Sequence, residues 1–187
     1  MSLHPPLLLP LQRGLAAVGT PISGADLALT LLLLGLYAAW ALPWGWRCGF
    51  LPRRWHRSPP AVLLRQAGAL LLMPALGEEL LFRVALLPHA AEALPAPAVL
   101  AWMALGLGAF VAYHPLSGRL WYPAGRSLFA DGRFLGLCAG LGLICSIAYV
   151  ASGSLIPPLL LHWLVVLVWL HPLNGLSRLR GAAPPQG

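Results

Sequence analysis

Two glutamates and an arginine lie inside a long apolar stretch of this chain, where charged side chains are least expected. Glu78, Glu79 and Arg83 fall between Leu70 and Pro88, and a charged side chain at mid-membrane depth costs roughly 2.5–3.5 kcal/mol on insertion scales. Glu79 and Arg83 are four residues apart with the acid first, a spacing that favours an ion pair on one helix face. Glu78 lies about 100° further around the helix, so its carboxylate stays available. These residues alone allow two interpretations, a polar knot that holds helices together and a functional site.

Two histidines interrupt other apolar stretches. His114 follows Phe110 by four residues, and His162 separates Leu159–Leu161 from Trp163–Val166. A single histidine in an apolar helix is more often a hydrogen-bonded core residue than a ligand. A carboxylate and two imidazoles that converge in a dry site could instead activate a water and stabilise an oxyanion. They could equally provide three ligands of a zinc ion with an open fourth position.

Three motifs follow one another along the chain. They are Glu78-Glu79-x-x-x-Arg83, Phe110-x-x-x-His114 and a histidine, His162, in the last long apolar stretch. In this order they resemble the CAAX protease and bacteriocin-processing family of intramembrane proteases, which includes the bacterial Abi proteins. The resemblance covers about residues 69–169, roughly half of the chain.

The resemblance implies a role for each of these residues. Glu78 would be the general base on the attacking water, with His114 assisting it, and His162 would help to hold the oxyanion. The supporting residues would be Glu79, Arg83 and Phe110. The reaction implied is hydrolysis of a peptide bond in a membrane-associated protein or peptide. It requires no metal or other cofactor, although zinc bound by the glutamate and the two histidines stays an alternative.

The chain departs from the family pattern at Val166. The family usually carries Asn or Asp four residues after the last histidine as a second oxyanion donor, and valine can donate nothing. The loss of one such donor typically costs about 10²–10³ in rate. Tyr113 and Ser146 are candidates for a group that replaces it, whereas Asn174 lies twelve residues from His162. The alternative function is therefore a non-catalytic membrane scaffold or bacteriocin-immunity-type protein that keeps the polar cluster for helix packing.

Composition places the chain in a membrane. Of its 187 residues 59% are hydrophobic and 9% are charged, and the mean hydropathy is +0.77. These values predict an all-α, polytopic transmembrane helical bundle in contact with the lipid bilayer. The net charge of +7 is carried by arginines without any lysine, and their clustering in loops indicates membrane orientation and not a nucleic-acid partner. The three cysteines are too scattered for a disulfide framework or a metal site, and are interpreted as apolar filler.

The chain is expected to have three segments, and about five membrane spans are predicted, all in the second. Residues 1–22 are expected to be irregular or interfacial, residues 23–175 to form the bundle, and residues 176–187 to be a disordered basic tail. The expected spans are Leu27–Pro43, Ala61–Pro88, Pro97–Tyr113, Phe134–Ala151 and Ile156–Leu170.

The second of these spans decides whether the site can form. In a straight helix that begins at Ala61, Glu78 would lie about 25 Å along the axis, too far from His114 for the two to share a water. The site closes only if Pro74 breaks the stretch.

Arginines predict the orientation of the bundle. The loop after the first span, the loop after the third and the tail hold four, three and two arginines, whereas segments 89–96 and 152–155 hold none. This alternation predicts a cytoplasmic C-terminus, in what the family resemblance suggests is a bacterial plasma membrane.

Overall fold

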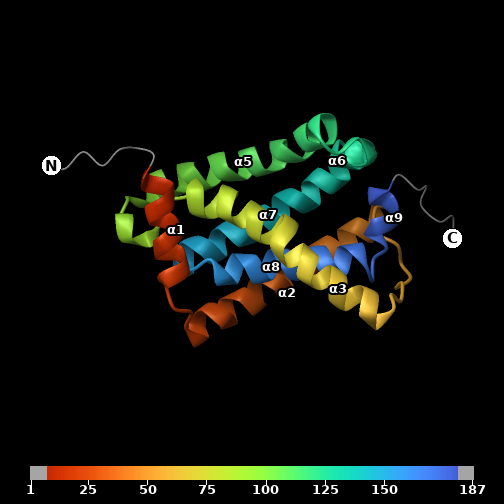
Figure 1. Ribbon diagram of the computed structural model, residues 1–187, viewed down its shortest axis with the longest axis horizontal. Coiled ribbons are helices and arrows are strands. Elements are labelled where there is room, and N and C mark those ends of the chain that lie inside the picture. The colour runs from red at the N-terminus through yellow and green to blue at the C-terminus, as the bar shows by residue number, and fades with distance from the viewer. Residues whose placement is uncertain (1–7, 181–187) are drawn as a thin grey trace.

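The protein is a bundle of helices that run side by side along its long axis (Figure 1), and the computed structural model describes residues 8–180. No strand occurs in this part of the chain, so the predicted all-α fold is confirmed. In chain order the elements are α1 (Leu9–Gly19), α2 (Gly24–Arg47), α3 (Pro60–Leu70), η2 (Leu71–Leu76), α4 (Gly77–Glu79), η3 (Leu80–Ala85), η4 (Ala90–Glu92), α5 (Ala96–Leu120), η5 (Pro123–Gly125), α6 (Arg126–Phe129), α7 (Gly132–Ser152), α8 (Ile156–Leu170) and α9 (Gly175–Leu179).

Within residues 8–180, three helices are long and apolar enough to cross a membrane. They are α2, α5 and α7, with 24, 25 and 21 residues, and about 20 apolar residues span a bilayer core. Helix α8 is also apolar but has only 15 residues. Three of the five predicted spans therefore meet the requirements of length and composition, and the count of five stays a prediction.

The stretch that carries the glutamates is a broken rod made of α3, η2, α4 and η3. Met73 has φ −141° and ψ 124°, an extended conformation inside an otherwise helical run. Proline disfavours the helical conformation at the residue before it and lacks the N–H that the helix needs, so Pro74 explains the break. The break predicted from Pro74 is confirmed, and Glu78 and Glu79 lie on the new helical segment that follows it.

Helix α7 lies at the centre of the bundle and packs against α2, α5 and α8. Its approach to α5 depends on Gly142, because a Cβ atom there would lie 2.8 Å from Leu107 Cδ1 and 2.9 Å from Phe110 Cδ1. Such distances are too short for real side chains, so only glycine lets the two helices meet this closely. This contact places Phe110, and with it His114, against α7.

The loops gather at two ends of the bundle. Helices α6 and α9 and the loop after α2 lie together at one end, and α1 lies at the other (Figure 1). We call the first the arginine end and define it by residues 47–59, 119–133 and 175–180, which hold nine of the twelve arginines. At the α1 end His89 Nε2 lies 2.9 Å from the carbonyl oxygen of Gly153. The arginine-rich segments thus share one end, as a positive-inside orientation requires, and the cytoplasmic side stays a prediction.

Local structure differs from expectation near both termini. Residues 9–19 of the segment expected to be irregular or interfacial form the helix α1, and Pro10 is compatible with it because it falls in the first helical turn, where a missing N–H costs nothing. The interfacial position of this segment stays a prediction. Arg13 fastens this helix to the bundle through a bidentate pair with Glu92, at 2.7 and 2.8 Å. Residues 175–179 form α9 where a disordered tail is expected to begin, and the rest of that tail, residues 181–187, lies outside the described residues.

Candidate active site

Glu79 and Arg83 form a fully buried ion pair. The Arg83 Nε atom lies 3.1 Å from Glu79 Oε2, and the two side chains are 1% and 0% exposed. Arg83 also donates from Nη2 to the carbonyl oxygen of Gly142 at 3.2 Å, and its guanidinium lies 4.4 Å from the centre of the Phe110 ring. The pair predicted from the i,i+4 spacing is confirmed, and it joins the broken rod to both α5 and α7.

His162 on α8 lies between the two glutamates. Its Nδ1 atom is 2.6 Å from Glu79 Oε1, and its Nε2 atom is 3.7 Å from Glu78 Oε2. Because an ionised carboxylate only accepts hydrogen bonds, Nδ1 carries the hydrogen in this contact. Nε2 therefore carries a hydrogen only when His162 is the imidazolium.

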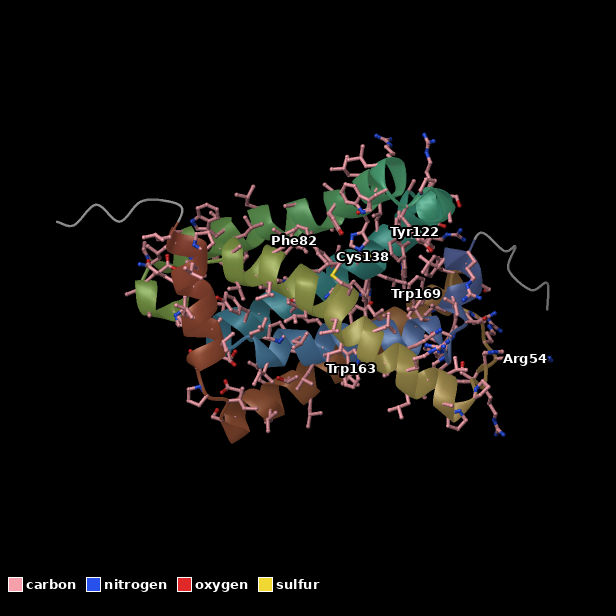
Figure 2. The ribbon with its side chains drawn as sticks, viewed as in Figure 1. Arg54, Phe82, Tyr122, Cys138, Trp163 and Trp169 are labelled. Carbon is pink, nitrogen blue, oxygen red and sulfur yellow. The ribbon has the colours of Figure 1, made fainter. Side chains whose placement is uncertain are left out.

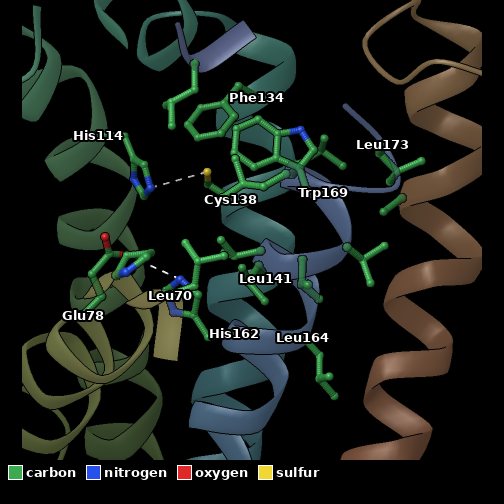
Figure 3. Close-up of a pocket in the computed structure, with 18 of the residues that line it drawn as sticks. Leu70, Glu78, His114, Phe134, Cys138, Leu141, His162, Leu164, Trp169 and Leu173 are labelled. Carbon is green, nitrogen blue, oxygen red and sulfur yellow. Dashed lines mark hydrogen bonds and ion pairs between the residues drawn. The ribbon is translucent and has the colours of Figure 1, made fainter. Parts of the chain in front are cut away.

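His114 on α5 is also held through its Nδ1 atom. Its Nδ1 atom lies 2.9 Å from the backbone oxygen of Phe110, and a carbonyl oxygen can only accept, so Nδ1 donates. In the neutral ring Nε2 is then an acceptor. The thiol of Cys138 lies 3.7 Å from this Nε2 atom, as the dashed line in Figure 3 shows.

A cavity of about 790 Å³ joins these groups. Glu78, His114 and His162 all line it (Figure 3), so the three predicted catalytic residues, from α4, α5 and α8, border one space. Phe110 lines the cavity as well, whereas Glu79 and Arg83 are not among its lining residues. The other lining side chains are almost all apolar, including those that α2 contributes.

The comparisons with known proteins agree with the family that the sequence motifs resemble. The family model for type II CAAX prenyl endopeptidase Rce1-like proteins matches residues 60–168, which is 109 of 187 residues. The chain belongs to this family. Neither a curated protein nor a solved structure matched it. Membership of the Rce1-like family implies an intramembrane protease, and the matched segment holds all three predicted catalytic residues and leaves out α1 and α2.

The described side chains of this Rce1-like chain that could bind a metal do not form a metal site. No group of three or more His, Cys, Asp and Glu side chains within residues 8–180 is arranged to hold a metal ion. The zinc alternative would need Glu78, His114 and His162 as ligands, and it finds no support in this geometry. The expected independence of a metal stays a prediction.

The two residues considered as replacements for the missing oxyanion donor lie in different places. Val166 and Tyr113 both line the cavity. Ser146 does not, because its hydroxyl donates to the carbonyl oxygen of Gly142 at 2.8 Å, inside α7.

Cys138 is a residue of the site that sequence reasoning missed. It lines the cavity and contacts His114, whereas a lone cysteine without a motif is normally apolar filler. Only the packing of α7 against α5 reveals its position, and no sequence signal would have indicated it.

Proposed function

We propose that the chain is an intramembrane endopeptidase that hydrolyses peptide bonds with a water activated by Glu78. The observation that supports this is the convergence of Glu78, His114 and His162 on one cavity. A cluster used only to join helices would pair its polar atoms with one another. In the described part of the chain Glu78 Oε2, like atoms of Glu79 and Arg83, is buried without a hydrogen-bond partner, but of these three residues only Glu78 lines the cavity.

In the proposed reaction Glu78 takes a proton from a water molecule in the cavity. His114 Nε2 accepts the second hydrogen of that water and so orients its oxygen toward the substrate carbonyl carbon. Attack forms the C–O bond and places a negative charge on the carbonyl oxygen, which the Nε2–H of the His162 imidazolium stabilises. The proton on Glu78 then passes to the amide nitrogen, the C–N bond breaks, and a carboxylic acid and an amine leave.

Glu79 and Arg83 act as positioning residues in this scheme. Glu79 accepts from His162 Nδ1 at 2.6 Å and so turns Nε2 toward Glu78. With His162 as the imidazolium, the charges of Glu78, Glu79, Arg83 and His162 sum to zero. A neutral cluster avoids most of the penalty that a net charge would incur inside an apolar bundle.

Val166 leaves this site with one oxyanion donor fewer than its relatives usually have. We propose that the hydroxyl of Tyr113, which lines the same cavity, donates in its place. A site without a second donor would be slower by about 10²–10³.

The Glu78→Gln variant tests the proposal. Glutamine keeps the shape of the side chain but is no base, so cleavage should fall by about 10²–10⁴ while the yield of folded protein stays the same. A substrate can be found by comparing the membrane proteomes of cells that carry wild type and Glu78→Ala. Glu92→Gln, an identical substitution at the α1 end, is the matched control and should keep cleavage. Equal cleavage by wild type and Glu78→Gln would refute the role of Glu78.

A non-catalytic scaffold or immunity-type protein is the second candidate, and the apolar Val166 favours it. In that case the purified wild-type protein would cleave no protein that accumulates in Glu78→Ala cells. Glu78→Gln would then lower the folded yield, because Glu78 would serve packing alone.

A further inference from the structure

The cavity reaches from the glutamates to the arginine end of the bundle. Its lining there includes Trp55, Trp121, Tyr122 and Leu179. These residues belong to three separate segments, namely the loop after α2, the connection between α5 and η5, and α9. Figure 2 shows Tyr122 and Arg54 at this end of the molecule. The cavity thus opens among loops and not only along the helix walls.

Each of the three segments brings arginines next to the cavity lining. Arg54 precedes Trp55, Arg119 lies two residues before Trp121, and Arg180 follows Leu179. All three arginines are exposed. None of them forms an ion pair with an acid in the described part of the chain.

The arginine end has almost no negative charge to balance these groups. Asp131 is its one acidic residue, and its carboxylate is already held by Arg133 at 2.7 Å. Arg178 donates to the carbonyl oxygen of Gly49 and lies 4.8 Å from the centre of the Phe50 ring, which itself lines the cavity. The segments that line this end of the cavity therefore carry exposed arginines that no acid in the described part of the chain pairs.

We propose that the arginines beside the cavity lining select substrates by charge, so that the cavity takes peptides whose apolar segment is flanked by acidic residues and rejects those with basic flanks. Clefts surrounded by charges of one sign focus the electric field and attract the opposite charge. Arginine also binds carboxylates through a planar, bidentate fork. Membrane orientation also requires positive charge in these three segments; the feature that bears on substrates is that arginines here adjoin residues of the cavity lining in the sequence. The inference rests on the proposed function, in that the cavity receives a peptide.

Peptide binding to the Glu78→Gln protein tests the inference without cleavage. The full chain would be placed in nanodiscs of phosphatidylcholine, which has no net charge. Two labelled peptides, blocked at both ends, would share one apolar segment and carry either three glutamates or three lysines beside it. Fluorescence anisotropy should show about tenfold tighter binding of the acidic peptide at low salt, equivalent to about 1.4 kcal/mol. The preference should shrink as salt is raised.

Two double variants distinguish the effect of arginines beside the cavity lining from the effect of the general surface charge. Arg53→Gln/Arg54→Gln removes two exposed charges beside Trp55 and should reduce the preference to less than about threefold. Arg47→Gln/Arg65→Gln also removes two exposed charges. Neither of its sites adjoins a residue of the cavity lining, so the preference should remain.

Three results would overturn the inference: equal or absent binding of the two peptides, equal loss of preference in both double variants, or loss of the preference in nanodiscs that contain phosphatidylglycerol. The last result would mean that the arginines serve anionic lipid. Cleavage by the wild-type protein is measured separately. An acidic preference in binding with no cleavage would leave the inference standing and refute the proposed function.

Discussion

Replacement of Arg83 by methionine tests the central ion pair most directly. Methionine retains much of the volume of the arginine stem, so the change removes charge and hydrogen bonds without leaving a large cavity. The Arg83 side chain is 1% exposed. The substitution removes its contacts with Glu79 at 3.1 Å, with the Gly142 oxygen at 3.2 Å and with the Phe110 ring at 4.4 Å. The Glu79 carboxylate, which is fully buried, is then left with His162 alone.

The expected loss follows from these contacts. Removal of one partner of a buried ion pair typically costs about 3–5 kcal/mol, because the other charge stays buried. His162 still compensates part of the Glu79 charge, so we expect Arg83→Met to destabilise the protein by about 3 kcal/mol, at the lower end of this range. The double variant Glu79→Gln/Arg83→Met removes both charges, and its amide oxygen can still accept from His162 Nδ1. It should recover at least half of the loss.

The free energy of unfolding of both variants can be measured in mixed micelles as a denaturing detergent is added. The fluorescence of the eight tryptophans follows the unfolding. Arg83→Lys is the control, since it keeps the charge but not the planar fork, and it should lie between wild type and Arg83→Met. The reasoning is refuted if Arg83→Met unfolds within about 1 kcal/mol of wild type, where single surface pairs fall. It is also refuted if the double variant is no more stable than the single one.

Three further predictions concern the rest of the bundle. Arg13 holds the pKa of Glu92 below its ordinary value of 4.5, so their bridge stabilises the protein above pH 4.5 and loses this effect as the pH falls below it. Arg13→Gln should thus unfold about 1.5–3 kcal/mol more easily near pH 7, with a smaller difference in acid, as unfolding across pH would reveal. Val166→Asn should keep its folded yield and raise cleavage or leave it unchanged, because Val166 borders the cavity; a lower yield without cleavage would count against the enzyme. Reporters at the C-terminus and within residues 90–95 should lie on opposite sides of the membrane, and detection of both on one side would contradict the topology.

The parts of the site that depend on local rules could be predicted from the sequence. The ion pair of Glu79 and Arg83 follows from helical spacing, and the break at Met73 follows from the proline after it. The long apolar runs likewise predict α2, α5 and α7, since an uninterrupted run of about 20 apolar residues has few other structures available.

The family resemblance implied that Glu78, His114 and His162 form one site, but the individual contacts between helices could not be predicted. The i,i+4 spacing predicts the ion pair of Glu79 with Arg83. No local sequence pattern indicates that His162, 83 residues further along the chain, donates to the same carboxylate. The contact of Cys138 with His114 depends on how closely α7 approaches α5, and this distance is set by Gly142. From composition alone, Gly142 cannot be distinguished from the other glycines in the apolar helices.

Helix α8 contacts the broken rod on both sides of the break at Met73, and these contacts determine the position of Glu78. Trp163 donates from Nε1 to the carbonyl oxygen of Ala67 at 2.8 Å, before the break. Its neighbour His162 holds Glu79 at 2.6 Å, after the break. Two adjacent residues of one helix thus bridge the break, and the angle between the two halves cannot change without the loss of one of these hydrogen bonds. Since the same histidine turns Nε2 toward Glu78, the contact that holds the rod also sets the geometry of the proposed reaction.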